Sequence, residues 1–193
     1  MTNQELLQLL RSEVIPAIGC TEPIAVALCV ARAKELLGTE PDEIDVYLSK
    51  NVYKNALAVG IPNTGMTGLP IAIALGATVG KSEYMLEVLR DATPEAVAYA
   101  KEYMLRVPTR LHINYEAPSI LYIHAEVRKC GQIAQATIID EHTNFVEDVP
   151  STASAFQQKH TDDNSLSMRR VYDFAMEIET RDINFLRVGA EMN

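Results

Sequence analysis

The apolar positions of this chain follow a helical period over its first half and a two-residue period over much of its second half. Leucines and a valine form one stripe between Gln4 and Val14, which predicts an amphipathic first helix. Small and apolar residues fill Leu69–Val79 and the first half of Glu22–Leu37, so both segments are predicted as buried helices. A Thr-Pro pair opens a further helix over 93–105.

Strict alternation of apolar and polar residues predicts strands elsewhere in the chain. It occurs at 43–49 and again at 111–115, and within 110–149 two further segments rich in β-branched residues flank a turn at Gly131. The polar segment 150–167 lacks periodicity and is predicted as a loop, after which 168–193 resumes a helical pattern. We therefore expect an α+β fold. Residues 1–109 and 168–193 would form a helical core with one strand at 43–49, and 110–149 would supply most of a largely antiparallel sheet.

Composition excludes several classes of protein. The 193 residues are 48% hydrophobic, enough to bury one sizeable core. The net charge is −9, and lysine and arginine do not cluster, so nucleic acid is not an expected partner. The N-terminus lacks the pattern of a secretory signal, and Leu69–Val79 is too short to cross a bilayer. These features predict a soluble cytoplasmic protein without a membrane partner.

The cysteines are the first candidates for chemistry. Cys20, Cys29 and Cys130 are too irregularly spaced for a disulfide framework or a metal site within this chain. Cys20 directly precedes a predicted helix capped by Thr21, and the positive end of the helix dipole would lower its pKa, although Glu22 would oppose that shift. The alternative is that Cys20 is a small buried hydrophobe. A redox-sensing thiol is a further hypothesis for the same residue.

The glycine-rich loop before the second buried helix is the candidate binding element. Its glycines permit positive φ, and successive N–H groups could hold a carboxylate or phosphate, although an ordinary tight turn has the same composition. The expected substrate-binding residues here are Asn63, Thr64, Gly65, Thr67 and Gly68.

Two further positions could contribute to the same site. Lys54, beside Asn55, could supply a positive charge for the anion, or it could be solvated at the end of a strand. His142 lies in a polar bend between strands, where an imidazole could act as acid or base near neutral pH or could simply be exposed.

Together these motifs resemble the L-cysteine desulfidase family, which is related to the iron–sulfur L-serine dehydratases. The stretches that carry the resemblance are Glu13 to Ile24 with Gly-Cys-Thr-Glu-Pro, Asn51 to Asn55, Gly60 to Gly65, Gly68 to Ala72, and His142-Thr143-Asn144. They span most of the chain but correspond to the N-terminal half of a typical family member.

The resemblance implies α,β-elimination from a small L-amino acid, either cysteine or serine. Family enzymes use a [4Fe-4S] cluster held by three cysteines, with one iron acting as a Lewis acid for the leaving group. Cys20 matches a residue proposed as a catalytic acid/base. The Asn63–Gly68 loop would receive the substrate carboxylate, and Lys54, Asn55 and His142 would line the pocket.

The cluster ligands of the family fall outside this chain. Neither Cys29 nor Cys130 matches a ligand motif, so a C-terminal half or a separate subunit would have to supply the cluster. We therefore expect the N-terminal half of a cluster-dependent lyase that is inactive alone and that could assemble in several copies. A non-catalytic amino-acid-binding or regulatory subunit is the alternative.

Overall fold

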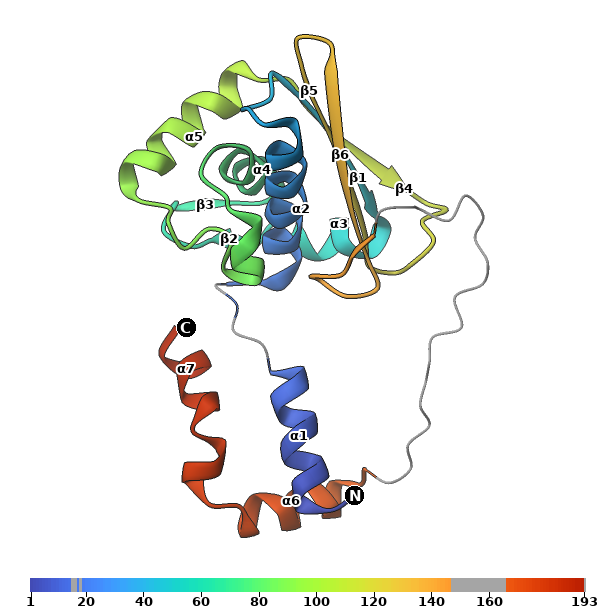
Figure 1. The fold of residues 1–193 in the computed structure, drawn as a ribbon, viewed down its shortest axis with the longest axis vertical. Coiled ribbons are helices and arrows are strands. Elements are labelled where there is room, and N and C mark those ends of the chain that lie inside the picture. The colour runs from blue at the N-terminus through green and yellow to red at the C-terminus, as the bar shows by residue number, and fades with distance from the viewer. Residues whose placement is uncertain (15–16, 18, 147–165, 193) are drawn as a thin grey trace. The chain divides into compact units, whose positions relative to one another are not determined.

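The computed structural model describes residues 1–14, 17, 19–146 and 166–192 (Figure 1). The chain forms two compact units, one of Met1–Ala17 with Gln157–Asn193 and one of Ile18–Phe156. This division differs from the expected one, which placed 168–193 in one helical core with 1–109. The C-terminal helices group with the first helix because Arg170 hydrogen-bonds to the carbonyl of Met1 and to the side chain of Asn3.

The larger unit is built on a five-stranded mixed sheet. Its strands are β1 (Glu43–Ser49), β4 (Thr109–Asn114), β5 (Tyr122–Lys129), β6 (Gln132–Ile139) and β7 (Phe145–Val146). Their order is β4-β1-β5-β6-β7, with β1 and β4 parallel and the other neighbours antiparallel. The predicted α+β class and largely antiparallel sheet are therefore confirmed.

Three helices lie on one side of this sheet. Helix α2 (Thr21–Leu37) packs on β5 and β6, α4 (Leu69–Thr78) packs on α2, and α5 (Pro94–Arg106) packs on α4 (Figure 1). Side chains from Ile24 to Ala31 in α2 have no solvent exposure, as their small apolar composition predicts. A Cβ on Gly76 would lie 2.4 Å from the carbonyl oxygen of Ala27, so α2 and α4 approach as closely as backbones can.

Short elements join the longer helices and strands, and two local features differ from prediction. The segment after β1, expected as the end of a strand, is helix α3 (Lys50–Ala56), capped by the Ser49 hydroxyl. After α4 the chain forms a 3-10 turn, η1 (Ser82–Glu87), interrupted at Met85 with φ 50°. The N-cap of α2 is Cys20, one residue before the expected Thr21. The glycine-rich loop forms a hairpin between β2 (Gly60–Ile61) and β3 (Met66–Thr67).

The smaller unit consists of helices alone in its described part. These are α1 (Asn3–Glu13), α6 (Met168–Glu177), η2 (Thr180–Ile183) and α7 (Phe185–Met192). Leu6 and Phe174 are buried in it. The loop expected over 150–167 and the end of the strand expected to reach Val149 lie almost wholly outside the described residues. Among the described helices, none combines the length and apolarity that crossing a membrane requires.

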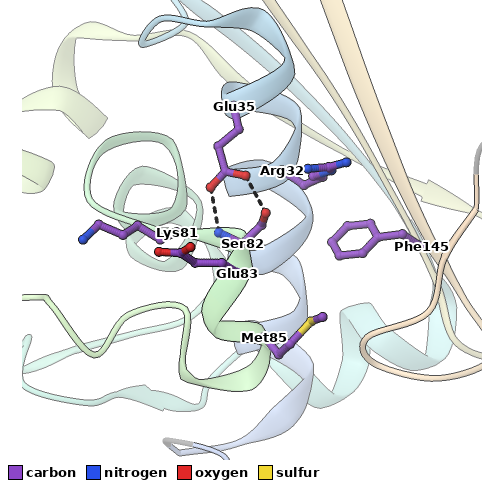
Figure 2. A pocket seen from close by; sticks show the side chains of 7 residues that line it. All are labelled: Arg32, Glu35, Lys81, Ser82, Glu83, Met85 and Phe145. Carbon is purple, nitrogen blue, oxygen red and sulfur yellow. Dashed lines mark hydrogen bonds between the residues drawn. The ribbon is translucent and has the colours of Figure 1, made fainter.

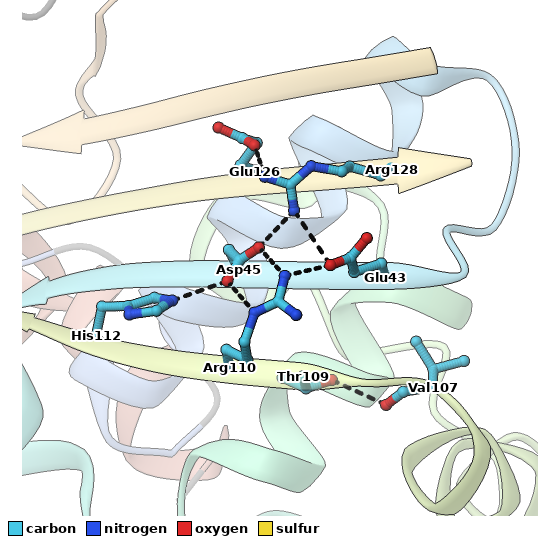
Figure 3. A network of polar contacts seen from close by, with 8 residues as sticks. All are labelled: Glu43, Asp45, Val107, Thr109, Arg110, His112, Glu126 and Arg128. Atoms are coloured by element: carbon cyan, nitrogen blue, oxygen red, sulfur yellow. Dashed lines mark hydrogen bonds and ion pairs between the residues drawn. The ribbon is translucent and has the colours of Figure 1, made fainter. Parts of the chain in front are cut away.

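The sheet face opposite α2 carries a charged network centred on Asp45, which is 2% exposed (Figure 3). Arg110 donates to both Asp45 oxygens at 2.7 Å, and His112 Nε2 lies 2.8 Å from Oδ1. Arg128 also donates to Asp45 from β5. Although burial opposes the shift, hydrogen bonds from Arg110 and then from His112 and Arg128 hold the pKa of Asp45 well below its usual value. Asp45 is therefore a carboxylate that fixes β4 and β5 on either side of β1.

Replacing Asp45 by asparagine is expected to destabilise the larger unit by about 1 to 2 kcal/mol at pH 7, because two arginines lose a charged acceptor. A depressed native pKa stabilises the fold above the unfolded pKa, and that stabilisation is lost as pH falls through the native value. The difference in unfolding free energy between wild type and Asp45→Asn should therefore decrease as the pH falls below about 4. Urea unfolding at pH 7 and pH 3 measures both effects.

Asp91→Asn is the matched control. Asp91 pairs with Lys81 at 2.7 Å, but both side chains are largely exposed, so its loss should change stability far less. Two results would contradict this description of Asp45. One is a difference in unfolding free energy between wild type and Asp45→Asn that does not change with pH. The other is an equal loss of unfolding free energy in Asp45→Asn and Asp91→Asn.

Candidate functional site

Cys20 belongs to a hydrogen-bonded chain that joins two helices. Its Sγ donates to Oε2 of Glu22 at 3.1 Å, and Nδ2 of Asn55 donates to the other carboxylate oxygen at 3.0 Å. The hydroxyl of Thr21 donates to Oε2 as well, at 3.2 Å. Glu22 lies in the first turn of α2 and Asn55 in α3, so the carboxylate ties the cysteine to both helices.

The prediction that Cys20 has a lowered pKa is wrong. Burial raises the pKa of the Cys20 thiol, and the hydrogen bond and charge of Glu22 raise it further, outweighing the backbone N–H groups at the start of α2. Burial alone would raise the pKa of Glu22, but hydrogen bonds from Cys20, its own N–H and Asn55 lower it. The resting pair is therefore a thiol donating to a carboxylate, which also removes the basis for a redox-sensing thiolate.

The stretch that carries Cys20 lies against the glycine-rich hairpin. Gly19 has φ +84°, and a Cβ built on it would lie 2.8 Å from Cγ of Pro62. A side chain at Gly19 would thus be strained in its backbone and would clash with the hairpin. The two stretches, about forty positions apart in sequence, are in direct contact at this point.

Within the hairpin, several groups expected to bind substrate serve the loop itself. The Thr64 hydroxyl is buried, lies 2.7 Å from the carbonyl oxygen of Ile61 and accepts from the N–H of Met66. The N–H groups of Thr64 and Gly68 bind the carbonyls of Ile61 and Val59. Gly68 has φ +85°, and a Cβ there would meet the carbonyl oxygen of Leu57 at 2.7 Å. Thr64 and Gly68 therefore have a clear structural role.

The remaining hairpin candidates are accessible. Asn63, Gly65 and Thr67 are exposed, and the first two adopt φ of 62° and 64°. Positive φ on either side of Thr64 turns the backbone sharply at the tip of the hairpin, so the residues at 63 and 65 face solvent. These three positions are the part of the loop that could contact a substrate carboxylate.

Lys54 and Asn55 point to different places although they are neighbours in sequence. Asn55 binds Glu22, whereas Lys54 lines a cavity with Asn114 and Tyr115 at the ends of β4 and α3. Successive helical side chains diverge by about 100° around the axis, which explains the separation. Lys54 and the Cys20–Glu22 pair are thus not joined by any hydrogen bond in the described part of the chain.

His142 lies in the bend between β6 and β7, which Asn144 closes by donating to the carbonyl of Ile139. The Nε2 atom of His142 is buried and has no hydrogen-bond partner in the structure as described. Buried polar atoms are usually hydrogen-bonded, so this nitrogen is a candidate to contact a ligand. Strand pairing places this bend at the end of the sheet where β1 leads into α3, because Ile139 pairs with Tyr122 and Leu48 with Ile123.

A second cavity, of about 550 Å³, lies between α2, η1 and β7 (Figure 2). Arg32 and Phe145 face it, but so do Glu35 and Glu83. Glu35 accepts from the backbone N–H of Ser82 at 2.7 Å and from its hydroxyl, which fixes the start of η1. With acidic and basic side chains mixed around it, this cavity indicates no particular ligand.

The cysteines of this chain do not fit a [4Fe-4S] cluster. Cys20 precedes α2, Cys29 is buried inside α2 with Sγ 3.2 Å from the carbonyl of Ala136, and Cys130 is exposed in the turn between β5 and β6. Among the residues the structure describes, no group of three or more histidine, cysteine or acidic side chains could hold a metal ion. A cluster with cysteine ligands would need residues from elsewhere.

Sequence reasoning assigned Glu22 only an electrostatic effect and missed its hydrogen bonds. The available signal was the position of Glu22 in the first helical turn, two residues after the N-cap Cys20. The Asp45 network was also missed. Its signal was an aspartate on the polar face of a strand, which becomes informative only once the strands carrying Arg110 and Arg128 are known to flank it.

Comparison with known proteins relates this chain to longer ones. It is similar to UPF0597 proteins. The protein BF3560 of Bacteroides fragilis is 44% identical over 197 residues, covering 98% of this chain and 46% of the relative. The UPF0597 protein of Bacteroides thetaiotaomicron is 46% identical with the same coverage, and that of Aeromonas hydrophila is 34% identical.

The chain thus spans less than half the length of these relatives, 45 to 46%. Their names state no activity. No family model matches the chain, and no solved structure matches it.

Proposed function

We propose that this chain is the N-terminal half of a [4Fe-4S]-dependent lyase of the L-cysteine desulfidase or L-serine dehydratase type, acting in the cytoplasm. The observation that carries the proposal is the Cys20–Glu22–Asn55 hydrogen-bonded chain beside the glycine-rich hairpin. The resemblance of these motifs to that family gives the reaction class. The greater length of the UPF0597 relatives supports a second half outside this chain.

The proposed reaction begins at the thiol–carboxylate pair. The Cys20 proton moves to Oε2 of Glu22, and the resulting thiolate takes the α-proton of the substrate. The carbon–sulfur bond of L-cysteine, or the carbon–oxygen bond of L-serine, then breaks with its electron pair on the leaving group. The aminoacrylate that remains reacts with water to give pyruvate and ammonia. A proton acceptor only 3.1 Å from Sγ makes the first transfer a short one.

Substrate orientation is assigned to the hairpin. Asn63, Gly65 and Thr67 are exposed beside Pro62, which contacts the Gly19-Cys20 stretch. Fixing the carboxylate there would hold the α-carbon near the sulfur, and positioning of this kind can supply much of the rate enhancement. His142, whose Nε2 has no hydrogen-bond partner among the described residues, is proposed as a second catalytic acid or base.

The cluster is assigned to a partner, either a separate subunit or a C-terminal half. This assignment follows from the cysteine positions, since Cys20, Cys29 and Cys130 lie in three different parts of the larger unit. The chain by itself should therefore bind substrate without converting it.

A reconstitution experiment tests the proposal. The purified chain is mixed with L-cysteine or L-serine, alone or with a polypeptide covering the rest of a UPF0597 relative whose cluster has been rebuilt anaerobically. Pyruvate is the better readout, because sulfide is also a reconstitution reagent. We expect pyruvate only when both polypeptides and iron are present.

The outcomes separate the proposal from its alternative. Binding of the amino acid without pyruvate under any condition would favour a non-catalytic binding or regulatory subunit. Pyruvate formation by the chain alone would contradict the assignment of the cluster to a partner.

A further inference from the structure

The cavity that Lys54 lines is distinct from the Cys20 site and lies where two parallel strands end. It measures about 330 Å³ and opens beyond the last residues of β1 and β4. These residues, Ser49 and Asn114, are paired across the two strands, and α3 begins directly after β1. The cavity thus lies at the carboxyl ends of the β1–β4 pair, the parallel pair among the described strands.

Hydrogen bonds hold the walls of this cavity in place. The Ser49 hydroxyl donates to the carbonyl of Ile120 at 2.6 Å and accepts from the N–H of Val52, so one side chain ties the segment before β5 to the start of α3. The Ser119 hydroxyl accepts from the N–H of Leu121, and Oδ1 of Asn114 accepts from the N–H of Glu116. The cavity is therefore largely preformed, as ligand sites usually are.

The charged side chains that line the cavity are all positive. Lys50 and Lys54 both line it, one helical turn apart on α3, whereas no carboxylate does. Both lysines are exposed, and neither forms an ion pair within the described residues. Like charges four residues apart destabilise a helix, and a chain of net charge −9 has many acidic residues that could have paired with them. A bound anion would offset this repulsion.

The other lining groups suit a small organic anion. Asn51 and Asn114 supply amides, and Tyr115 and Ile120 form an apolar edge, with exposed fractions of 77% and 66%. The cavity of Figure 2 differs, since two glutamates share its wall with the basic residues.

We propose that this cavity binds a small organic anion. Its carboxylate or phosphate would lie between Lys50 and Lys54, and an apolar or planar part would lie against Tyr115 and Ile120. The site is independent of the proposed lyase chemistry, because none of its lining residues belongs to the Cys20–Glu22–Asn55 chain.

An NMR titration tests the proposal. Benzoate, phenyl phosphate and inorganic phosphate are each added to the intact chain while its backbone amide signals are recorded. We expect saturable shifts in the amides of residues 49–54 and 114–121, and comparison of benzoate with phenyl phosphate identifies the preferred anionic group. The double variant Lys50→Gln/Lys54→Gln should bind about tenfold more weakly or worse, because both charged donors are lost. Benzylamine, which has the ring but the opposite charge, should not bind.

Lys101→Gln is the matched control, because Lys101 lies in α5 and lines neither cavity; it should bind within about twofold of wild type. Cys20→Ser should bind the anions like wild type, so failure of the lyase proposal and failure of this one are distinguishable. Unchanged affinity in the double variant with an intact amide spectrum, or no saturable binding of any of the three anions, would overturn the proposal.

Discussion

Cys20→Ser is expected to lower pyruvate formation from L-cysteine by about 10²- to 10⁴-fold in the reconstituted two-part protein, the range typical of losing a general acid–base group. The serine hydroxyl can still donate to Glu22, so the local fold should persist. Its pKa is far above that of a thiol, however, and it cannot readily give up the proton that Sγ passes to Glu22. The loss should appear in kcat more than in KM, because the hairpin and not the sulfur is assigned to bind the carboxylate.

Cys130→Ser is the matched control for this variant. It makes the same atomic change in an exposed turn at the junction of β5 and β6 and should leave the rate unchanged. Glu22→Gln should reproduce most of the loss, because the amide keeps the shape of the carboxylate but accepts no proton. A Cys20→Ser protein that retains more than half of the wild-type rate would exclude the thiol as a proton carrier.

Gly76→Ala is expected to destabilise the larger unit by about 2 to 3 kcal/mol, the upper part of the range for overpacking a core. The new Cβ would lie 2.4 Å from the carbonyl oxygen of Ala27 and 3.0 Å from its Cα. Both are backbone atoms inside a fully buried stretch of α2, so neither can move without displacing the helix. Alanine favours the helix over glycine by only about 1 kcal/mol, which the clash exceeds. Urea unfolding followed by circular dichroism measures the net loss.

Gly60→Ala provides the comparison. Nothing lies within 4 Å of a Cβ placed there, and its φ is not positive, so stability should stay within about 0.5 kcal/mol of wild type. Equal stability of the two variants would mean that α2 and α4 are not packed as closely as described.

The elements with a strong local pattern could be predicted from the sequence. Helix α4 and the first half of α2 consist largely of small apolar residues, and Thr93 and Pro94 mark the start of α5 as N-cap and first helical residue. Helix α3 was missed because its seven residues show no apolar period. Its remaining signal was Ser49, whose hydroxyl accepts from the N–H of Val52 as an N-cap does.

The candidate site was predictable in its residues but not in its geometry. The composition of two stretches was enough to identify Cys20 and the glycine-rich loop. The contact between Gly19 and Pro62, which requires a glycine at position 19, could not be predicted because no local pattern encodes it. The raised pKa of Cys20 depends first on its burial and then on the hydrogen bond to Glu22, whose carboxylate is also bound by Asn55 from another helix; the burial and the Asn55 contact are tertiary features. The Lys54 cavity depends on the pairing of β1 with β4, a tertiary feature that alternation alone leaves open.

The most direct test of the thiol–carboxylate pair is the pH dependence of Cys20 alkylation by iodoacetamide. Mass spectrometry of the peptides measures the modification of each cysteine. We predict a midpoint above the ordinary range of a free cysteine, about 8.5, and a lower midpoint in Glu22→Gln, because the hydrogen bond and charge that raise the pKa are then removed. Cys29, whose burial raises its pKa to about 12, should stay unmodified and serves as an internal reference for the folded state. A Cys20 midpoint below 8.5, or one that Glu22→Gln leaves unmoved, would contradict the pairing of Cys20 with Glu22 on which the proposed chemistry depends.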